Sequence, residues 1–317
     1  MEPRATLARI AGVGALLIAS CASPPERALA PDALRQEVAR RAPDLAARDV
    51  PVLFEVQSEV IERMRRDTRG ALDDADRLER VVELLSDPDA FALRYEWATT
   101  RTAREALELG GGNCLSLSSV LIGVARGLGM RAYYAETLEI DADWRSDLEL
   151  SVAAGHIAVV IPTSRGRAYV DFSGTLSPTR RFRAISDLEA LAHYYNNHGY
   201  ELLHLAMRAR LEPPWAEALL AFERAALIAP GFAQAWNNVG LARRRLGDHD
   251  EAERAYQRAL ELQSDLLSAQ LNLAALYVAD GAVDSAMARL DAAYRLAPDH
   301  PGIVRLRALA LQGTSVP

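Results

Sequence analysis

The last third of the chain repeats with a period of about 34 residues. A unit of this length is one pair of helices, which cannot bury its apolar face alone and therefore stacks on the next unit. The sequence thus predicts an all-α solenoid over 199–313, with units at 199–232, 233–266 and 267–300 and a terminal helix. The equivalent positions are Leu202, Trp236 and Gln270; Leu205, Val239 and Leu273; Ala206, Gly240 and Ala274; Ala218, Ala252 and Ala286; Phe222, Tyr256 and Leu290; and Ala225, Ala259 and Ala293.

This pattern resembles the tetratricopeptide repeat (TPR), with small residues where paired helices approach, an aromatic residue in the second helix and a closing Pro230 or Pro298. An unrelated helical bundle is the alternative. The resemblance implies a groove that binds a protein or peptide partner. Asn238 and Asn272 occupy equivalent positions on first helices, and the resemblance implies that they face this groove and hold a peptide backbone.

The segment 1–20 reads as a targeting signal rather than as part of the fold. Arg4 and Arg9 form a basic start, and an apolar stretch from 10 to 18 follows. The stretch is too short for an ordinary transmembrane helix. It ends in small residues before Cys21, which resembles a bacterial lipoprotein signal; a plain secretory signal is the alternative.

The lipoprotein resemblance implies cleavage before Cys21 and attachment of fatty acyl chains, palmitate among them. Residues 21–32, rich in Pro and Ala, then form a tether. The resemblance further implies a periplasmic protein anchored in a bacterial membrane, with the outer membrane favoured because Ala22 is not the aspartate that retains lipoproteins in the inner one.

Glycines Gly110–Gly112 mark a tight turn or a close backbone approach directly before Asn113 and Cys114. An apolar stripe then predicts a buried helix that begins near Cys114. The unpaired N–H groups at a helix N-terminus stabilise anions, which favours a reactive sulfur there. If Cys21 carries lipid, Cys114 has no disulfide partner, so it is either a buried packing residue or a nucleophile. The stripe consists of Leu117, Val120, Leu121, Val124, Ala125 and Leu128.

Residues 33–109 are mostly helical in pattern, including the stretch from 91 to 97, and strand patterns follow at 130–140, 156–162 and 167–172. A turn at 164–165 makes the last two strands a hairpin. In that register His156 and Asp171 are diagonal neighbours within side-chain reach. A cysteine nucleophile needs a base and a group that orients the base, so Cys114, His156 and Asp171 are candidates for a catalytic triad. The alternatives are a hydrogen-bonded structural histidine and a strand-end cap.

The segments 103–132, 155–159 and 169–171 together resemble the transglutaminase-like (papain-like) cysteine family. The resemblance implies an α+β domain with a small antiparallel sheet, here 33–195 with N-terminal helices. It implies that Cys114 is the nucleophile, His156 the base and then the acid, and Asp171 its orienting group. The backbone N–H of Cys114 would stabilise the oxyanion, with Asn113 or Trp97 as the second donor.

These features predict a membrane-anchored, periplasmic cysteine acyl-transfer enzyme, in which hydrolysis by a peptidase or amidase is expected more than amine crosslinking. The alternative is an inactive adaptor lipoprotein that scaffolds an envelope complex. The net charge of −7 leaves no basic footprint for nucleic acid. No cofactor or metal is expected, because His193 and His198 lack a known ligand spacing and read as a linker between domains.

Overall fold

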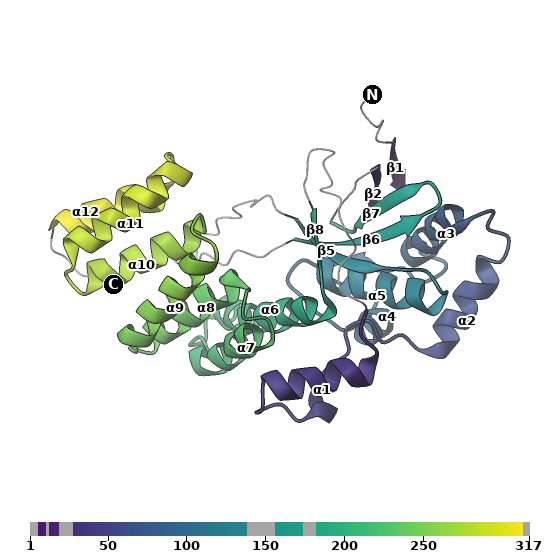
Figure 1. The fold of residues 1–317 in the computed structure, drawn as a ribbon, viewed down its shortest axis with the longest axis horizontal. Coiled ribbons are helices and arrows are strands. Elements are labelled where there is room, and N and C mark those ends of the chain that lie inside the picture. The colour runs from purple at the N-terminus through teal and green to yellow at the C-terminus, as the bar shows by residue number, and fades with distance from the viewer. Residues whose placement is uncertain (1–5, 11–12, 19–27, 138–155, 174–181, 313–317) are drawn as a thin grey trace. The chain divides into compact units, whose positions relative to one another are not determined.

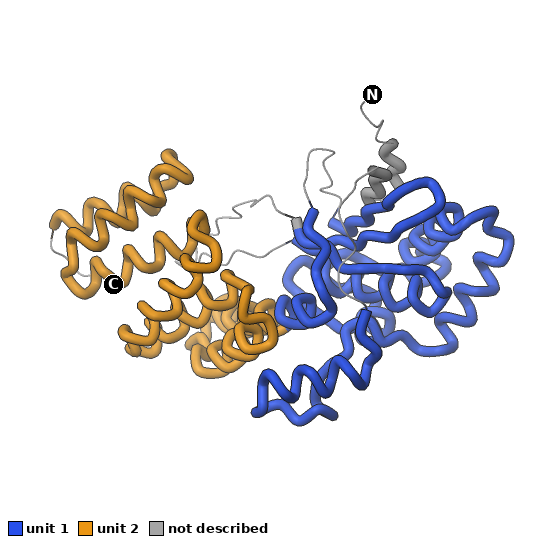
Figure 2. Tube along the Cα trace, viewed as in Figure 1, with its two compact units in different colours: residues 1–140, 155–194 blue, residues 141–154, 195–317 orange. Residues whose placement is uncertain are grey.

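The structure is a computed structural model that describes residues 6–10, 13–18, 28–137, 156–173 and 182–312. Cys21 and most of the expected tether lie outside the described residues. The chain divides into two compact units, one of residues 1–140 and 155–194 and one of residues 141–154 and 195–317 (Figure 2). No described helix is both long and apolar enough to cross a membrane.

The first unit is built around a sheet of six strands in the order β1-β2-β7-β6-β5-β8 (Figure 1). All neighbouring strands are antiparallel. The strand patterns in the sequence correspond to β5, β6 and β7, whereas β8 was not expected. The strands are β1 (Thr6–Ile10), β2 (Val13–Ile18), β5 (Tyr133–Thr137), β6 (Ile157–Thr163), β7 (Gly166–Asp171) and β8 (Phe182–Ile185).

The expectation that the segment 1–20 takes no part in the fold differs from the structure. Strand β2 pairs with β7 from Gly14 opposite Asp171 to Ile18 opposite Arg167, and β1 pairs with β2. An apolar run has high strand propensity, and pairing satisfies the backbone groups on the edge of β7. Cleavage before Cys21 would therefore leave β7 as the edge strand.

Helices α1 to α5 lie between β2 and β5 in the chain. The most buried is α5, in which every residue from Leu115 to Ala125 is buried, and its Ser118 hydroxyl donates to the Ile157 carbonyl at 3.4 Å. The helices are α1 (Pro31–Arg41), α2 (Ser58–Asp67), α3 (Asp74–Ser86), α4 (Ala103–Leu109) and α5 (Cys114–Gly127), with a 3-10 turn at Ala47–Asp49.

The helix expected at 91–97 is wrong. The chain turns at Ala92, whose φ is 52°, and then forms β3 (Arg94–Tyr95), which pairs in parallel with β4 (Gly111–Gly112). This pairing requires glycine, because a Cβ on Gly111 would lie 2.3 Å from the carbonyl oxygen of Arg94. The close backbone approach expected of the glycine run is confirmed.

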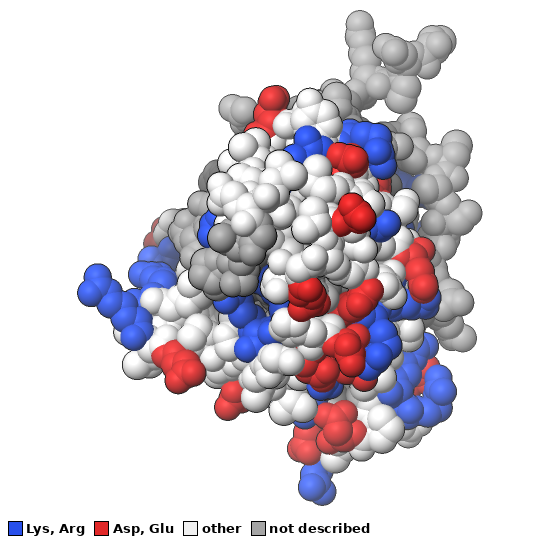
Figure 3. Space-filling model, turned by 90° about the vertical axis from the view of Figure 1, so that its left-hand side faces the viewer, with Lys and Arg blue, Asp and Glu red and all other residues white. Residues whose placement is uncertain are grey.

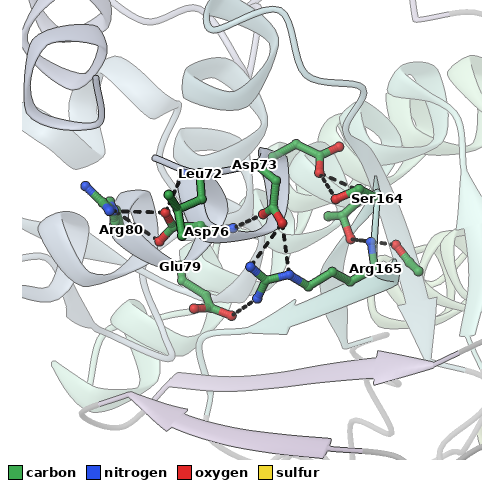
Figure 4. Close-up of polar contacts among 10 residues, drawn as sticks. Leu72, Asp73, Asp76, Glu79, Arg80, Ser164 and Arg165 are labelled. Carbon is green, nitrogen blue, oxygen red and sulfur yellow. Dashed lines mark hydrogen bonds and ion pairs between the residues drawn. The ribbon is translucent and has the colours of Figure 1, made fainter. Parts of the chain in front are cut away.

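The N-terminus of α3 holds the tip of the β6–β7 hairpin (Figure 4). Asp73 caps the helix by accepting from the Asp76 N–H at 2.8 Å, and it also accepts from Arg165 Nε at 3.1 Å. Asp74 accepts from the backbone N–H and the hydroxyl of Ser164, at 2.9 and 2.6 Å. Four hydrogen bonds from the turn and within the cap thus converge on two neighbouring carboxylates.

The second unit consists of helices. Helices α8, α10 and α12 begin at residues 233, 267 and 301, so the expected period holds for them. The helices are α6 (Asp187–Arg208), which begins in the first unit, then α7 (Trp215–Ile228), α8 (Ala233–Arg245), α9 (His249–Leu262), α10 (Leu267–Ala279), α11 (Val283–Leu296) and α12 (Pro301–Gln312).

The register expected for the first repeat is wrong. A Cβ on Gly240 would lie 2.7 Å from the ring of Tyr256, and the matching contact in the first repeat joins Gly199 to Phe222 at 2.6 Å. Gly199 rather than Ala206 is therefore equivalent to Gly240. Leu205, the expected equivalent of the buried Val239, is 62% exposed, which agrees with this reassignment. The first repeat begins before residue 199, and its first helix is about two turns longer than the others.

Candidate functional site

Cys114 is the first residue of α5, and its thiol is half-buried and free of any disulfide. Asn113 caps this helix, because its side-chain oxygen accepts from the Ser116 N–H at 3.1 Å. The backbone N–H of Asn113 donates to the Thr99 carbonyl at 2.8 Å. The segment after β3 thus fixes the start of α5 and, with it, the position of the sulfur.

His156 and Asp171 are brought together by the β6–β7 hairpin. The turn is at 164–165, with Thr163 paired with Gly166, which is the predicted register. The Nε2 atom of His156 lies 2.7 Å from Oδ1 of Asp171, which is fully buried. With Nε2 engaged, Nδ1 is the nitrogen available to exchange a proton with a thiol.

Ser173 belongs to the same cluster and was not expected from the sequence. Its backbone N–H donates to Oδ1 of Asp171 at 2.8 Å, and its hydroxyl donates to Oδ2 at 2.9 Å. The hydroxyl also lies 3.2 Å from Nε2 of His156. The sequence could have predicted this position of Ser173. The hairpin register that makes Asp171 diagonal to His156 also places Ser173 directly opposite His156.

The charges of this cluster favour a protonated histidine. Burial lowers the pKa of His156, but hydrogen bonding to Asp171 and the interactions with Cys114 and with the Asp171 charge outweigh burial and raise the pKa to about 10. Burial likewise raises the pKa of Asp171, and the hydrogen bonds and charge of its neighbours bring it below its usual value. Because Cys114 contributes to the raised pKa of His156, its sulfur lies beside the His156–Asp171 pair.

The two residues named as further oxyanion donors differ in position. The side-chain nitrogen of Asn113 donates to the Thr100 hydroxyl at 2.7 Å, and the residue is only 5% exposed, so its amide serves the cap instead. Trp97 is 42% exposed. It lies in the turn that follows β3, where the Thr99 N–H donates to the Glu96 carbonyl. Its role as a donor stays a prediction.

Among the described residues, His193 and His198 of α6 do not belong to a group that could hold a metal ion. His193 is buried, and its Nε2 atom lies 3.6 Å from the carboxylate of Glu136, which is also paired with Arg183 at 2.8 Å. Burial lowers the pKa of His193, and it also lowers that of His198. Within the described ranges, no group of three or more histidine, cysteine, aspartate or glutamate residues is placed to hold a metal ion.

Asn238 and Asn272, expected to face a peptide groove, are instead buried and bonded to neighbouring repeats. Asn272 Nδ2 donates to Asn237 at 3.0 Å, Asn237 donates to Asn238 at 3.1 Å, and Asn238 donates to Asn196 at 2.7 Å. Amides with these partners are not presented to a ligand. They form a polar ladder that joins α6, α8 and α10 through the interior of the second unit.

Comparisons with known proteins concern the second unit. Residues 233–266, the predicted middle unit, match the family model of the tetratricopeptide repeat. No curated protein sequence matches the chain.

Among solved structures, the chain is similar to the TPR domain of Arabidopsis OM64 (15% identity, TM-score 0.35, covering 39% of this chain and 98% of that one). It is also similar to the TPR2B domain of yeast Sti1 in complex with pHsp70 (22%, 0.33, 37% and 97%). A third is the first TPR of Spaghetti (RPAP3) bound to an HSP90 peptide (16%, 0.34, 38% and 90%). The family match and the helices of the second unit give an all-helical, TPR-like C-terminal region, and the first unit carries the sheet.

Proposed function

We propose that the first unit is a transglutaminase-like cysteine acyl-transfer enzyme and that the TPR-like region holds a protein partner for it. The observation that carries the proposal is the grouping of Cys114, His156 and Asp171: the imidazole is hydrogen-bonded to a buried carboxylate, and the sulfur at a helix N-terminus is near enough to raise the pKa of the ring. A histidine between a thiol and a carboxylate is the arrangement that thiol acyl transfer requires.

The chemistry follows from these positions. The sulfur of Cys114 attacks an amide carbonyl carbon; the new S–C bond forms, and the C–N bond breaks as the leaving amine takes a proton from His156. A water then attacks the thioester, gives a proton to His156, and releases the acid as the C–S bond breaks. The position of Cys114 as the first residue of α5 supports its N–H as the oxyanion donor in both steps, because the first N–H groups of a helix have no partner within the helix.

We further propose that hydrolysis rather than crosslinking is the outcome and that the mature protein is lipid-anchored through Cys21 on the periplasmic side of a bacterial membrane. The signal pattern before Cys21 supports the anchor. The mass of the mature protein tests it: an N-terminal acylated cysteine is expected, and an intact Met1 or an unmodified Cys21 would contradict it.

The enzyme proposal is tested by thiol reactivity. In a Cys21→Ser background, iodoacetamide should label Cys114 near neutral pH, and His156→Ala should slow labelling by about 10²-fold or more. Equal, slow labelling of both proteins would refute the enzyme. If, instead, Cys114→Ser preserved the protein's role in the cell, the adaptor function would replace it.

A further inference from the structure

Three serines are buried inside α5. Ser116, Ser118 and Ser119 are each fully buried, in a stretch from Leu115 to Ala125 that contains no charged residue. Charged side chains of both signs are instead seen on the surface of the molecule (Figure 3). A buried hydroxyl destabilises a protein unless it is hydrogen-bonded, and serine is a weaker helix former than alanine. We therefore expect the three hydroxyls to make contacts that a purely apolar helix could not make.

Each serine joins α5 to a different part of the first unit. The three contacts are Ser116 Oγ with the Arg101 N–H at 2.7 Å, Ser118 Oγ with the Ile157 carbonyl at 3.4 Å, and Ser119 Oγ with the Tyr134 hydroxyl at 2.9 Å. Of these three, the contact of Ser118 is the one that reaches β6. Because Ile157 directly follows His156 in the chain, this contact joins α5 to the backbone beside the histidine.

Ser118 also lies on the same face of α5 as the thiol. It follows Cys114 by four residues, which is about one helical turn, so the two side chains are neighbours along the helix. The effect of Cys114 on the pKa of His156 independently places the sulfur on the face that meets β6. One turn of α5 thus carries two contacts with two consecutive residues of β6 and its start.

The sheet alone does not hold the backbone of His156. The pairing of β6 with β5 ends at Ile157 opposite Glu136, and its pairing with β7 ends at Val159 opposite Val170. His156 therefore lies beyond both ladders, and the contact of Ser118 is made at the last residue that the sheet pairs. Reacting groups need to be held within about 0.5 Å of their productive geometry by the hydrogen bonds of supporting residues.

We propose that Ser118 is a positioning residue, whose bond to the Ile157 carbonyl holds the start of β6 against α5 and thereby keeps the sulfur of Cys114 beside the imidazole of His156. Ser118 acts through the backbone of Ile157 and does not itself exchange a proton. The inference rests on the proposed function, because the sulfur that it positions is the proposed nucleophile.

The experiment measures the pKa of His156 by nitrogen-15 NMR in the full chain. Ser118→Ala should lower this pKa, because the contribution of Cys114 weakens as the start of β6 moves away from α5. In a Cys114→Ala background the same change should have no further effect, since the contribution through which it acts is absent. Ser119→Ala is the matched control. It removes an equally buried hydroxyl and leaves that of Tyr134 without this partner, so it should lower the melting temperature at least as much and leave the pKa of His156 unchanged.

The labelling rate of Cys114 gives a second readout. In the Cys21→Ser background, Ser118→Ala should slow the reaction with iodoacetamide by about 2- to 10-fold, as expected for the loss of one hydrogen bond, and Ser119→Ala should not slow it. An unchanged pKa of His156 in Ser118→Ala would overturn the proposal, and so would equal falls in the two serine variants, which would indicate general loosening of α5.

A further fall of the pKa in the Cys114→Ala background would show that Ser118 acts on the pair of His156 with Asp171, and it would overturn the proposal as well. Failure of the proposed function is a separate result. Slow labelling of the parent chain that does not depend on His156 would refute the enzyme, whereas the pKa measurements on the serine variants would still test the positioning.

Discussion

His156 and Asp171 lie diagonally across the β6–β7 hairpin, with Nε2 of the imidazole 2.7 Å from Oδ1 of the carboxylate. The diagonal follows from the pairing of Val159 with Val170, which sets the register of every later pair. A buried carboxylate on one ring nitrogen fixes the orientation of the imidazole and leaves the other nitrogen available for proton exchange. If Cys114 is the proposed nucleophile, the reactivity of its thiol depends on the geometry of this hairpin.

The first prediction concerns the titration of His156. Since its pKa is raised from 6.5 to about 10, the ring should remain an imidazolium through neutral pH and lose its proton only as the pH rises toward 10. The charges and hydrogen bonds of Asp171 and Cys114 cause the rise, so Asp171→Asn and Cys114→Ala should each lower the pKa. Nitrogen-15 NMR of the imidazole measures both effects. A ring already neutral at pH 8 in the unchanged chain would contradict the cluster.

The second prediction assigns a positioning role to Ser173. Its hydroxyl and N–H hold the two carboxylate oxygens of Asp171. Ser173→Ala removes one of these bonds, which is worth about 1 kcal/mol, so labelling of Cys114 should slow by about 2- to 10-fold. Ser173→Thr should restore the rate and the NMR titration of His156, which a merely structural role would not move. Ser58→Ala, at an exposed serine of α2, is the control.

Local patterns in the sequence predicted much of this site. The stripe after Cys114 is α5, and alternation with a turn at 164–165 gave the hairpin register. The segment 91–97 could not be predicted, because its helix-like spacing is overridden by backbone pairing with the glycine run, a contact distant in sequence. The capping role of Asn113, by contrast, is local, because its side chain accepts from the Ser116 N–H, and an asparagine directly before a predicted helix is a signal for an N-cap.

The first repeat shows a different limit of prediction from the sequence. Gly199 takes the position of Gly240, whereas the expected equivalent, Ala206, lies one full period before Gly240. Gly199 and Ala206 are separated by about two helical turns, which bring the pattern back to nearly the same face of α6. The periodicity of apolar residues cannot distinguish them. The contact of Gly199 with the Phe222 ring and the hydrogen bond of Asn196 to the asparagine ladder distinguish the two registers.

The third prediction concerns the clamp between α3 and the hairpin tip. Asp73→Ala removes the helix cap and the partner of Arg165, so it should destabilise the first unit by about 1–2 kcal/mol. Arg165→Ala removes only an exposed ion pair and should cost less than about 1 kcal/mol. Hydrogen exchange of peptides from β6 and β7 measures the loss, with Asp49→Ala, an exposed aspartate, as the control. Equal protection in Asp73→Ala and Asp49→Ala would show that the clamp is not needed.

The fourth prediction concerns the asparagine ladder. Asn237 is its central member, since it accepts from Asn272 and donates to Asn238. Asn237→Ala leaves two buried amide groups without these partners and should destabilise the second unit by about 2–4 kcal/mol. Asn272→Ala, at the end of the ladder, should cost about half as much. Urea unfolding followed by the fluorescence of Trp236 measures the difference. Equal costs would mean that each amide acts alone.

The last prediction separates packing from hydrogen bonding at one contact. Tyr256 is fully buried and its hydroxyl has no hydrogen-bond partner among the described residues, so Tyr256→Phe removes an unsatisfied group and should stabilise the second unit by up to about 1 kcal/mol. Gly240→Ala places a methyl group 2.7 Å from the same ring, and the overpacking of about 1–3 kcal/mol should exceed the gain in helix propensity. Thermal unfolding of both variants measures whether each one raises or lowers the stability.

Combining Gly240→Ala with Tyr256→Leu should recover part of the lost stability, because the smaller leucine side chain vacates the space of the ring. A Gly240→Ala chain as stable as its parent would mean that the ring moves freely, which would contradict the close packing of α8 and α9.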